Sequence, residues 1–200
     1  HVRSRRQRQM CIRDSIEPLF NDKVFKLNKN KFNFQNTLKE IIFNKFEGQI
    51  DTGEMMDALL NKAYKSNIKI INNVSVKTYE DIGPSVKVHT NQFAISCNKL
   101  FIATNGFSES IIQEKVVPAR AQVLITKPIK NLKVIGTFHF QQGYYYFRNI
   151  DDRILLGGGR NLDFHIENTN QFGVTDTIQS KLEQLLTCLL YTSDAADDSL

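Results

Sequence analysis

Residues 99–110, with the sequence KLFIATNGFSES, place the strongest constraint on the fold. Their apolar run at 100–103 predicts a buried strand, because it is short, continuous and bounded by polar residues. The strand would end at once on small or polar residues, and the polar residues that follow favour the start of a helix. In open α/β sheets, ligands bind beyond the carboxyl ends of the strands, so this strand end is a candidate ligand site.

The residues at this strand end suit a ligand that carries phosphate groups. Small residues let a ligand approach the backbone, glycine adopts torsion angles that other residues avoid, and the following amides can face a phosphate. Thr104 and Asn105 can also donate hydrogen bonds. The alternative is an ordinary strand stop with turn residues. The candidate ligand-binding residues here are Ala103, Thr104, Asn105 and Gly106.

The segment DTGEMMDALLNKAYKSN contains the clearest helical pattern of the chain. Met55 and Leu59 recur at helical spacing. Asp51 or Thr52 suits the N-cap, and Glu54 stands where a capping box from Asp51 would place it. A helix followed by β-rich sequence favours a βα unit on a parallel sheet.

Strand patterns follow this helix. The runs at 68–76 and 86–104 are rich in β-branched residues and predict strands, and Gly83 and Pro84 predict a turn between them. Near the start of the chain, residues 38–42 show a short helical pattern among aromatic residues. Near the end, a helix is expected from about Thr175, and its apolar stripe would be formed by Ile178, Leu182 and Leu185.

The composition excludes several classes of protein. The 200 residues suffice for one domain or parts of two, and 41% hydrophobic and 24% charged residues are ordinary for a globular protein. No apolar run is long enough to span a bilayer, so no transmembrane segment is expected. The cysteines at 11, 97 and 188 have neither paired nor metal-ligand spacing, which favours a reducing, cytoplasmic setting and no metal site.

Both ends of the chain differ from its middle. Residues 1–15, HVRSRRQRQMCIRDS, and the acidic residues 188–200 resemble peptides translated from sequencing-adapter DNA, so we expect two non-native ends. The native piece would then run from about 16 to 187, from inside a longer chain. The alternative for the basic end is a nucleic-acid-binding arm, but no nucleic acid partner is expected, because the remaining charge is modest.

Four motifs, in the expected order, resemble the D-amino-acid-oxidase-like (DAO) superfamily of FAD-dependent oxidoreductases. They are the helix and strand at 48–76, the ending IATNG, the strand VVPARAQVLITKPI, and the hairpin GYYYFRNIDDRILLGGGRN. The resemblance covers nearly all of 46–187. It departs from the family at Ala121, where many relatives have glycine, and by the absence of a G-x-G-x-x-G motif. We therefore expect residues 1–200 to bind FAD weakly or not at all, and to be inactive by themselves.

The resemblance implies an α/β fold in which a partial FAD-binding domain, of the glutathione-reductase-like Rossmann type, is interleaved with a mixed-sheet substrate domain. The FAD-binding segment would be 47–116, and the substrate-domain segments would be 16–46 and 117–187.

The resemblance also implies an enzyme. A hydride passes to the flavin from the carbon beside an amine of a small-molecule amine or amino acid, the resulting imine is hydrolysed, and electrons pass to oxygen or another acceptor. No catalytic side chain is identified, and this chemistry requires none. Two alternatives remain within flavoproteins: a dehydrogenase that passes electrons to quinone, or a flavin domain that acts on a modified tRNA base.

The resemblance adds Val74, Arg120 and Gln122 to the candidate cofactor-binding residues at 103–106. Strand alternation places the candidate substrate-binding residues Tyr144, Tyr146 and Arg148 on one face, where the arginine could pair with a substrate carboxylate. The alternative is a sheet core with a rim arginine bound to Asp151 or Asp152. Gly157 and Gly158 would permit close approach, either of the flavin or of a neighbouring strand.

Overall fold

The computed structural model describes residues 16–32, 34, 40–112 and 114–190. The described chain divides into two compact units, each treated by itself below. Unit 1 contains the described residues up to Gln49, together with Gln122–Leu162 and the residues from Val174 onward. Unit 2 contains Ile50–Ala121 and Asp163–Gly173. The end at 1–15, which is predicted to be non-native, lies outside the described residues, and so do residues 191–200 of the other predicted non-native end.

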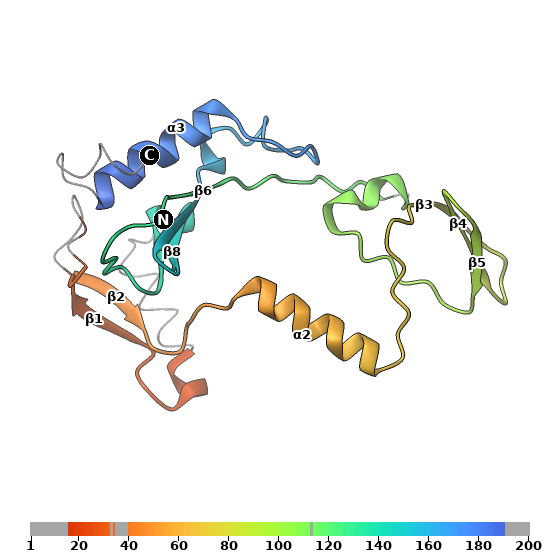
Figure 1. Ribbon diagram of the computed structural model, residues 1–200, viewed down its shortest axis with the longest axis horizontal. Coiled ribbons are helices and arrows are strands. Elements are labelled where there is room, and N and C mark those ends of the chain that lie inside the picture. Colours follow the sequence, from red (N-terminus) through yellow and green to blue (C-terminus); the bar gives the residue numbers. More distant parts are fainter. Residues whose placement is uncertain (1–15, 33, 35–39, 113, 191–200) are drawn as a thin grey trace. The chain divides into compact units, whose positions relative to one another are not determined.

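A four-stranded antiparallel sheet forms the centre of unit 1, with the strand order β6-β9-β8-β7; Figure 1 labels its strands β6 and β8. β8 and β9 form a hairpin, in which the side chains of Tyr145 and Phe147 on β8 and of Ile154 and Leu156 on β9 are buried at alternate positions. The sheet therefore has one face packed in the core and one open face. The strand bounds are β6 Val123–Ile125, β7 Thr137–Phe140, β8 Tyr145–Ile150 and β9 Arg153–Gly158.

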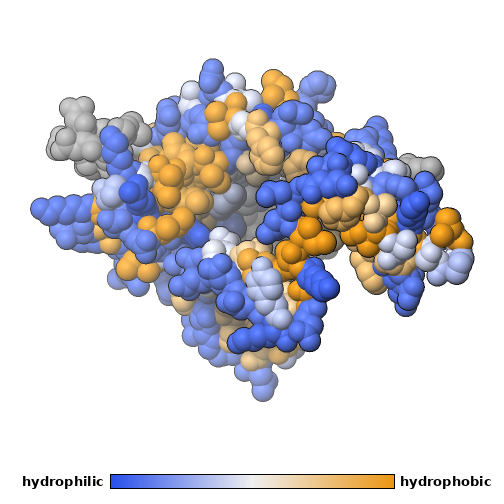
Figure 2. All heavy atoms as spheres, turned by 45° about the vertical axis from the view of Figure 1, so that its right-hand side comes forward, coloured by the Kyte–Doolittle hydropathy of each residue, from blue (hydrophilic) through white to orange (hydrophobic). Residues whose placement is uncertain are grey.

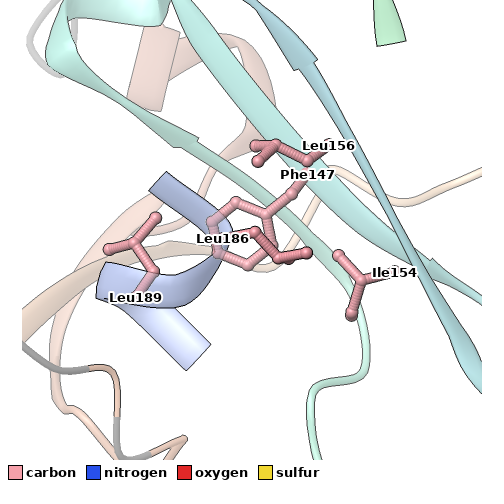
Figure 3. A pocket seen from close by; sticks show the side chains of 5 residues that line it. All are labelled: Phe147, Ile154, Leu156, Leu186 and Leu189. Carbon is pink, nitrogen blue, oxygen red and sulfur yellow. The ribbon is translucent and has the colours of Figure 1, made fainter. Parts of the chain in front are cut away.

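Helix α3, Asp176–Leu190, packs against β6 and β9 and closes the core of unit 1. The buried residues Ile178 and Leu182 recur every four residues along it, and Leu186 continues the series. Phe147 and Leu156 meet them from the sheet (Figure 3). The predicted helix and its apolar stripe are confirmed. The helix also runs three residues beyond the boundary that the sequence suggested at 187.

A second hairpin in unit 1 joins β1, Phe25–Lys29, to β2, Glu40–Asn44. The helical pattern expected at 38–42 is wrong for its described part, because Ile41 and Ile42 lie in β2 and pair with β1. A short apolar run fits either periodicity, so only its pairing with β1 decides the conformation. Residues 38 and 39 lie outside the described residues.

Unit 2 begins with helix α2, Thr52–Lys65. Asp51 is its N-cap, as predicted: one carboxylate oxygen accepts hydrogen bonds from the amides of Gly53 and Glu54, at 2.8 and 3.0 Å. No residue of α2 is buried. Figure 2 shows apolar side chains at the surface of the molecule, and in α2 the exposed ones include Met56 and Leu59.

A three-stranded antiparallel sheet of order β3-β4-β5 follows in unit 2. β3 is Val76–Asp81, β4 is Val86–Thr90 and β5 is Ala94–Cys97. The predicted turn at Gly83 is confirmed, and its φ of 85° explains the glycine. The strand expected at 68–76 is displaced, since β3 starts only at Val76 and residues 68–75 are irregular.

The strand predicted at 100–103 does not form among the described residues. Phe101 is 86% exposed, and the six described strand pairs are all antiparallel. A strand exists through a ladder of hydrogen bonds with a neighbour, and no described strand supplies one to this segment. The expectation of a parallel sheet is therefore not met within the described part of the chain.

Candidate functional site

Residues 103–106 form a tight corner in unit 2. Asn105 adopts a left-handed conformation, with a φ of 49°, and begins the 3-10 helix η1, Asn105–Ser110. Inside the corner, the Thr104 hydroxyl donates to the Ser108 hydroxyl at 3.1 Å, and Ser108 donates to the Asn105 carbonyl at 2.6 Å. Ser108 is buried, whereas Ala103 and Asn105 are exposed. Internal hydrogen bonds thus stabilise the corner, while Ala103 and Asn105 are exposed at its surface.

The corner borders a hollow of about 290 Å³, lined by Gly106, Phe107, Glu109, Ser110 and Asn170. A hollow of this volume lies at the lower end of small-molecule sites, so it has room for part of a dinucleotide. Gly106 also packs closely on Pro118, whose Cβ would lie 3.2 Å from an added Cβ. A larger residue at 106 would therefore force Pro118 to shift by a few tenths of an ångström, even before any ligand is considered.

Val74 lies in the irregular segment before β3 and is half-buried. Its neighbour Asn73 has a φ of 60°, and the Asn73 carbonyl accepts a hydrogen bond from Gln92 Nε2 at 2.9 Å. Asn91 Oδ1 accepts from the Ser75 amide at 2.8 Å. The turn between β4 and β5 thus holds the backbone on both sides of Val74.

Arg120 forms a bidentate ion pair within unit 2. Its Nη2 and Nε donate to the two carboxylate oxygens of Glu167, at 2.8 and 3.0 Å, and Nη1 lies 3.5 Å from the Gln171 carbonyl. Glu167 is completely buried. The hydrogen bond to Glu167 raises the pKa of the Arg120 guanidinium above its ordinary value, against an opposing effect of desolvation. Arg120 therefore stays charged and held in one orientation.

Gln122, in unit 1, is buried, and its carboxamide lies at the start of α3. Its Nε2 donates to Thr175 Oγ1 at 2.8 Å, and its Oε1 accepts from the Thr175 amide at 3.0 Å and from Gln179 Nε2 at 3.1 Å. Its carbonyl accepts from the Gly158 amide at 3.2 Å. Gln122 thereby joins the first turn of α3 to the end of β9.

The three candidate substrate residues lie on or beside β8. Tyr145 and Phe147 are buried in the core, so Tyr146 and Arg148 lie on the open face of the sheet, as alternation predicts. Tyr144 precedes β8, closes the 3-10 turn η2, Gln141–Gly143, and is 44% exposed. The open face thus carries an aromatic ring and a guanidinium two residues apart.

The candidate residues fall into the two units. Val74, 103–106 and Arg120 belong to unit 2, whereas Gln122 and the residues of β8 belong to unit 1. Sequence reasoning missed Glu167, the partner of Arg120. The only signal was a glutamate in a polar, aperiodic stretch, which gives no reason to expect complete burial.

Two comparisons place the chain among known proteins. The profile of the family described as "FAD dependent oxidoreductase" (DAO) matches residues 20–196, which is most of the chain. The chain belongs to this FAD-dependent oxidoreductase family. The resemblance inferred from the motifs is therefore confirmed, and so is the FAD dependence of the family.

Among solved structures, the DAO-family chain is similar to NikD, described as an unusual amino acid oxidase essential for nikkomycin biosynthesis, in its open form. The TM-score is 0.64 at 14% sequence identity, with 88% of this chain and 51% of NikD covered. The likeness supports a shared α/β fold, and the chain spans about half the length of NikD. Comparison with curated protein sequences gives no significant match. Within the described residues, no helix is both long and apolar enough to cross a membrane.

Of the four residues at 103–106, Gly106 lines the hollow, together with the acidic residue Glu109. Exposed small residues beside a hollow allow close approach, and Asn105 offers an amide side chain at the surface. Arg120 is a fixed cation, although its contacts to Glu167 use two of its three nitrogens. These residues could hold part of a dinucleotide.

Proposed function

We propose that the protein oxidises an amine or an amino acid by hydride transfer to FAD, and that the imine product is then hydrolysed. The observation that carries this proposal is the open face of the unit 1 sheet, where Tyr146 and Arg148 lie side by side along β8. Membership of the FAD-dependent family supports the redox class. A small-molecule substrate with a carboxylate matches the chemistry of this face.

In this proposal the residues of β8 bind and orient the substrate. Arg148 pairs with the substrate carboxylate, since a guanidinium matches that group with two parallel hydrogen bonds. Tyr144 and Tyr146 supply aromatic surface against the rest of the substrate and exclude water. When bound, FAD supplies the acceptor for the hydride that leaves the carbon beside the amine. No side chain has to become a nucleophile.

On the cofactor side, we propose that Val74, Ala103, Thr104, Asn105 and Gly106 contact FAD through their backbone and small side chains, with Arg120 and Gln122 on the flavin side. The final electron acceptor is oxygen or another oxidant.

The cytoplasmic setting, the absence of a nucleic acid partner and the domain boundaries stay predictions. Weak or absent FAD binding by residues 1–200 alone also stays a prediction. Flavin absorbance after incubation with FAD and gel filtration would measure it.

The substrate class is tested with a matched pair of compounds, alanine and ethylamine, which differ by the carboxylate. In the FAD-loaded full-length protein that contains this chain, Arg148→Gln should raise KM for alanine about 10- to 100-fold, because charge-assisted hydrogen bonds are lost. KM for ethylamine should change less than about twofold. Equal losses with both compounds would show that Arg148 does not bind the carboxylate. Oxidation of neither compound or of related amines by the wild type would refute the proposed reaction.

A further inference from the structure

The three consecutive glycines at the end of β9 are required for different reasons. Gly158 has a φ of 122°, and an added Cβ would lie 2.0 Å from the Tyr144 carbonyl oxygen. Gly159 has a φ of 82°. Both conformations disfavour any other residue. Gly157 differs, because its φ lies outside the left-handed region and its backbone is that of an ordinary strand residue.

What requires glycine at 157 is the side chain of Tyr146. An added Cβ would lie 2.5 Å from Cζ, 2.6 Å from Oη and 2.9 Å from Cε2 of that ring. Contacts this short do not occur, so a side chain at 157 would force the ring to move. Gly157 pairs directly with Tyr146 across the β8–β9 ladder. The phenol therefore lies across the backbone of β9.

This contact lies on the open face of the sheet. Phe147 follows Tyr146 on β8, and Leu156 precedes Gly157 on β9. Both side chains belong to the core that α3 covers (Figure 3). Tyr146 and Gly157 consequently point the other way, onto the face that also carries Arg148. On the other side of β8 lies β7, and the ring of its residue His139 lies 6.4 Å from the Tyr146 ring, measured between centroids. The Tyr146 hydroxyl is thus directed over β9 and away from β7.

We infer that Gly157 is a positioning residue for substrate binding, which leaves room for the Tyr146 phenol over β9 and so sets where that ring lies relative to Arg148. The inference rests on the proposed function, in which Tyr146 and Arg148 hold the substrate. Both glycines make room for β8 and the residue before it, since Gly157 accommodates the side chain of Tyr146 and Gly158 accommodates the backbone of Tyr144.

A double-mutant cycle of Gly157→Ala and Tyr146→Ala tests the inference in the FAD-loaded full-length protein that contains this chain, with alanine as substrate. With Tyr146 present, Gly157→Ala should lower the thermal unfolding midpoint by about 5 °C. It should also raise KM about tenfold, while kcat changes less than about twofold. With Tyr146→Ala in place, both effects of Gly157→Ala should disappear, because the clash is gone.

Gly48→Ala is the matched control. An added Cβ there has no atom within 4 Å and its φ lies outside the left-handed region, so it should leave the midpoint and KM unchanged. If Gly157→Ala raises KM equally in both backgrounds, or couples to Tyr146 in stability but not in KM, the positioning role is refuted while the proposed function stands. If Tyr146→Ala alone leaves KM unchanged, the proposed substrate face fails, and the inference fails with it.

Discussion

At the scale of single residues, the contacts of Arg120 are set by Glu167, 47 positions later in the chain. A completely buried carboxylate is stable only when its charge is paired and its oxygens accept hydrogen bonds. Arg120 provides both with its Nε and Nη2, and its own amide donates to the Glu167 carbonyl at 2.8 Å. The pair therefore fixes residues 163–173 to the rest of unit 2.

Glu167→Gln should destabilise unit 2 strongly, because it leaves the guanidinium beside a neutral amide in a buried place. We expect the thermal unfolding midpoint to fall by about 5–10 °C. The control is Glu114→Gln at an exposed position of the same unit, which should change the midpoint by less than about 1 °C. Equal effects of the two substitutions would contradict a structural role for the ion pair.

Tyr145 predicts a pH dependence at the residue scale. Desolvation by burial raises the pKa of its phenol above the ordinary value of 10.0. Folding therefore favours the neutral phenol, and this contribution is complete below pH 10 and is lost as the pH rises through the folded-state pKa. The free energy of unfolding should fall above pH 10 in the wild type and fall less steeply in Tyr145→Phe. Parallel curves from urea unfolding at a series of pH values would refute this.

At the scale of elements, two helices of similar length differ in what stabilises them. α3 buries an apolar stripe against β6 and β9, whereas α2 has no buried residue. A helix without packing depends on its caps and its intrinsic propensity. The carboxylate of Asp51 and the lysines of the last turn, Lys62 and Lys65, are therefore important for α2.

Asp51→Ala should destabilise α2 by about 1 kcal/mol, because two amides of the first turn lose their acceptor. Faster hydrogen exchange at the amides of residues 53–58 would report the loss. The control is Asp57→Ala, which removes a carboxylate from the same helix but not from its cap. If Asp57→Ala accelerates exchange as much as Asp51→Ala, charge rather than capping stabilises the helix.

Leu182→Ala should destabilise unit 1 by about 3 kcal/mol, because the side chain is completely buried and its removal leaves a cavity under the sheet. Chemical denaturation would measure the difference. Ser180→Ala, at an exposed position two residues earlier, should stay within about 0.5 kcal/mol of the wild type. A small effect of Leu182→Ala would mean that α3 is not essential to the core.

At the scale of the whole molecule, the chain crosses between its two compact units near residues 49, 121, 162 and 173. Each unit is compact by itself, so we expect the two units to unfold as separate cooperative bodies, and a single free energy of unfolding would then not describe the molecule. Unit-specific substitutions should therefore have unit-specific effects.

Native-state hydrogen exchange tests this directly. Leu182→Ala should accelerate exchange in the sheet β6-β9-β8-β7 and leave β3-β4-β5 unchanged, and Glu167→Gln should accelerate exchange in unit 2 alone. The two variants serve as controls for each other. If either one accelerates exchange throughout both units, the molecule unfolds as one cooperative body.

Several local elements and the family were predictable from the amino-acid sequence. The periodicity of α2 and α3, the Asp51 cap, the Gly83 turn and the alternation along β8 follow from interactions within a few residues, so they can be read along the chain. The tertiary structure alone decided that Ile41 and Ile42 lie in a strand, that 100–103 has no strand partner among the described residues, and that Glu167 meets Arg120. It also separated the roles of Gly157 and Gly158. Those outcomes depend on which segments, distant in the sequence, pack against these residues, and no local pattern contains that information.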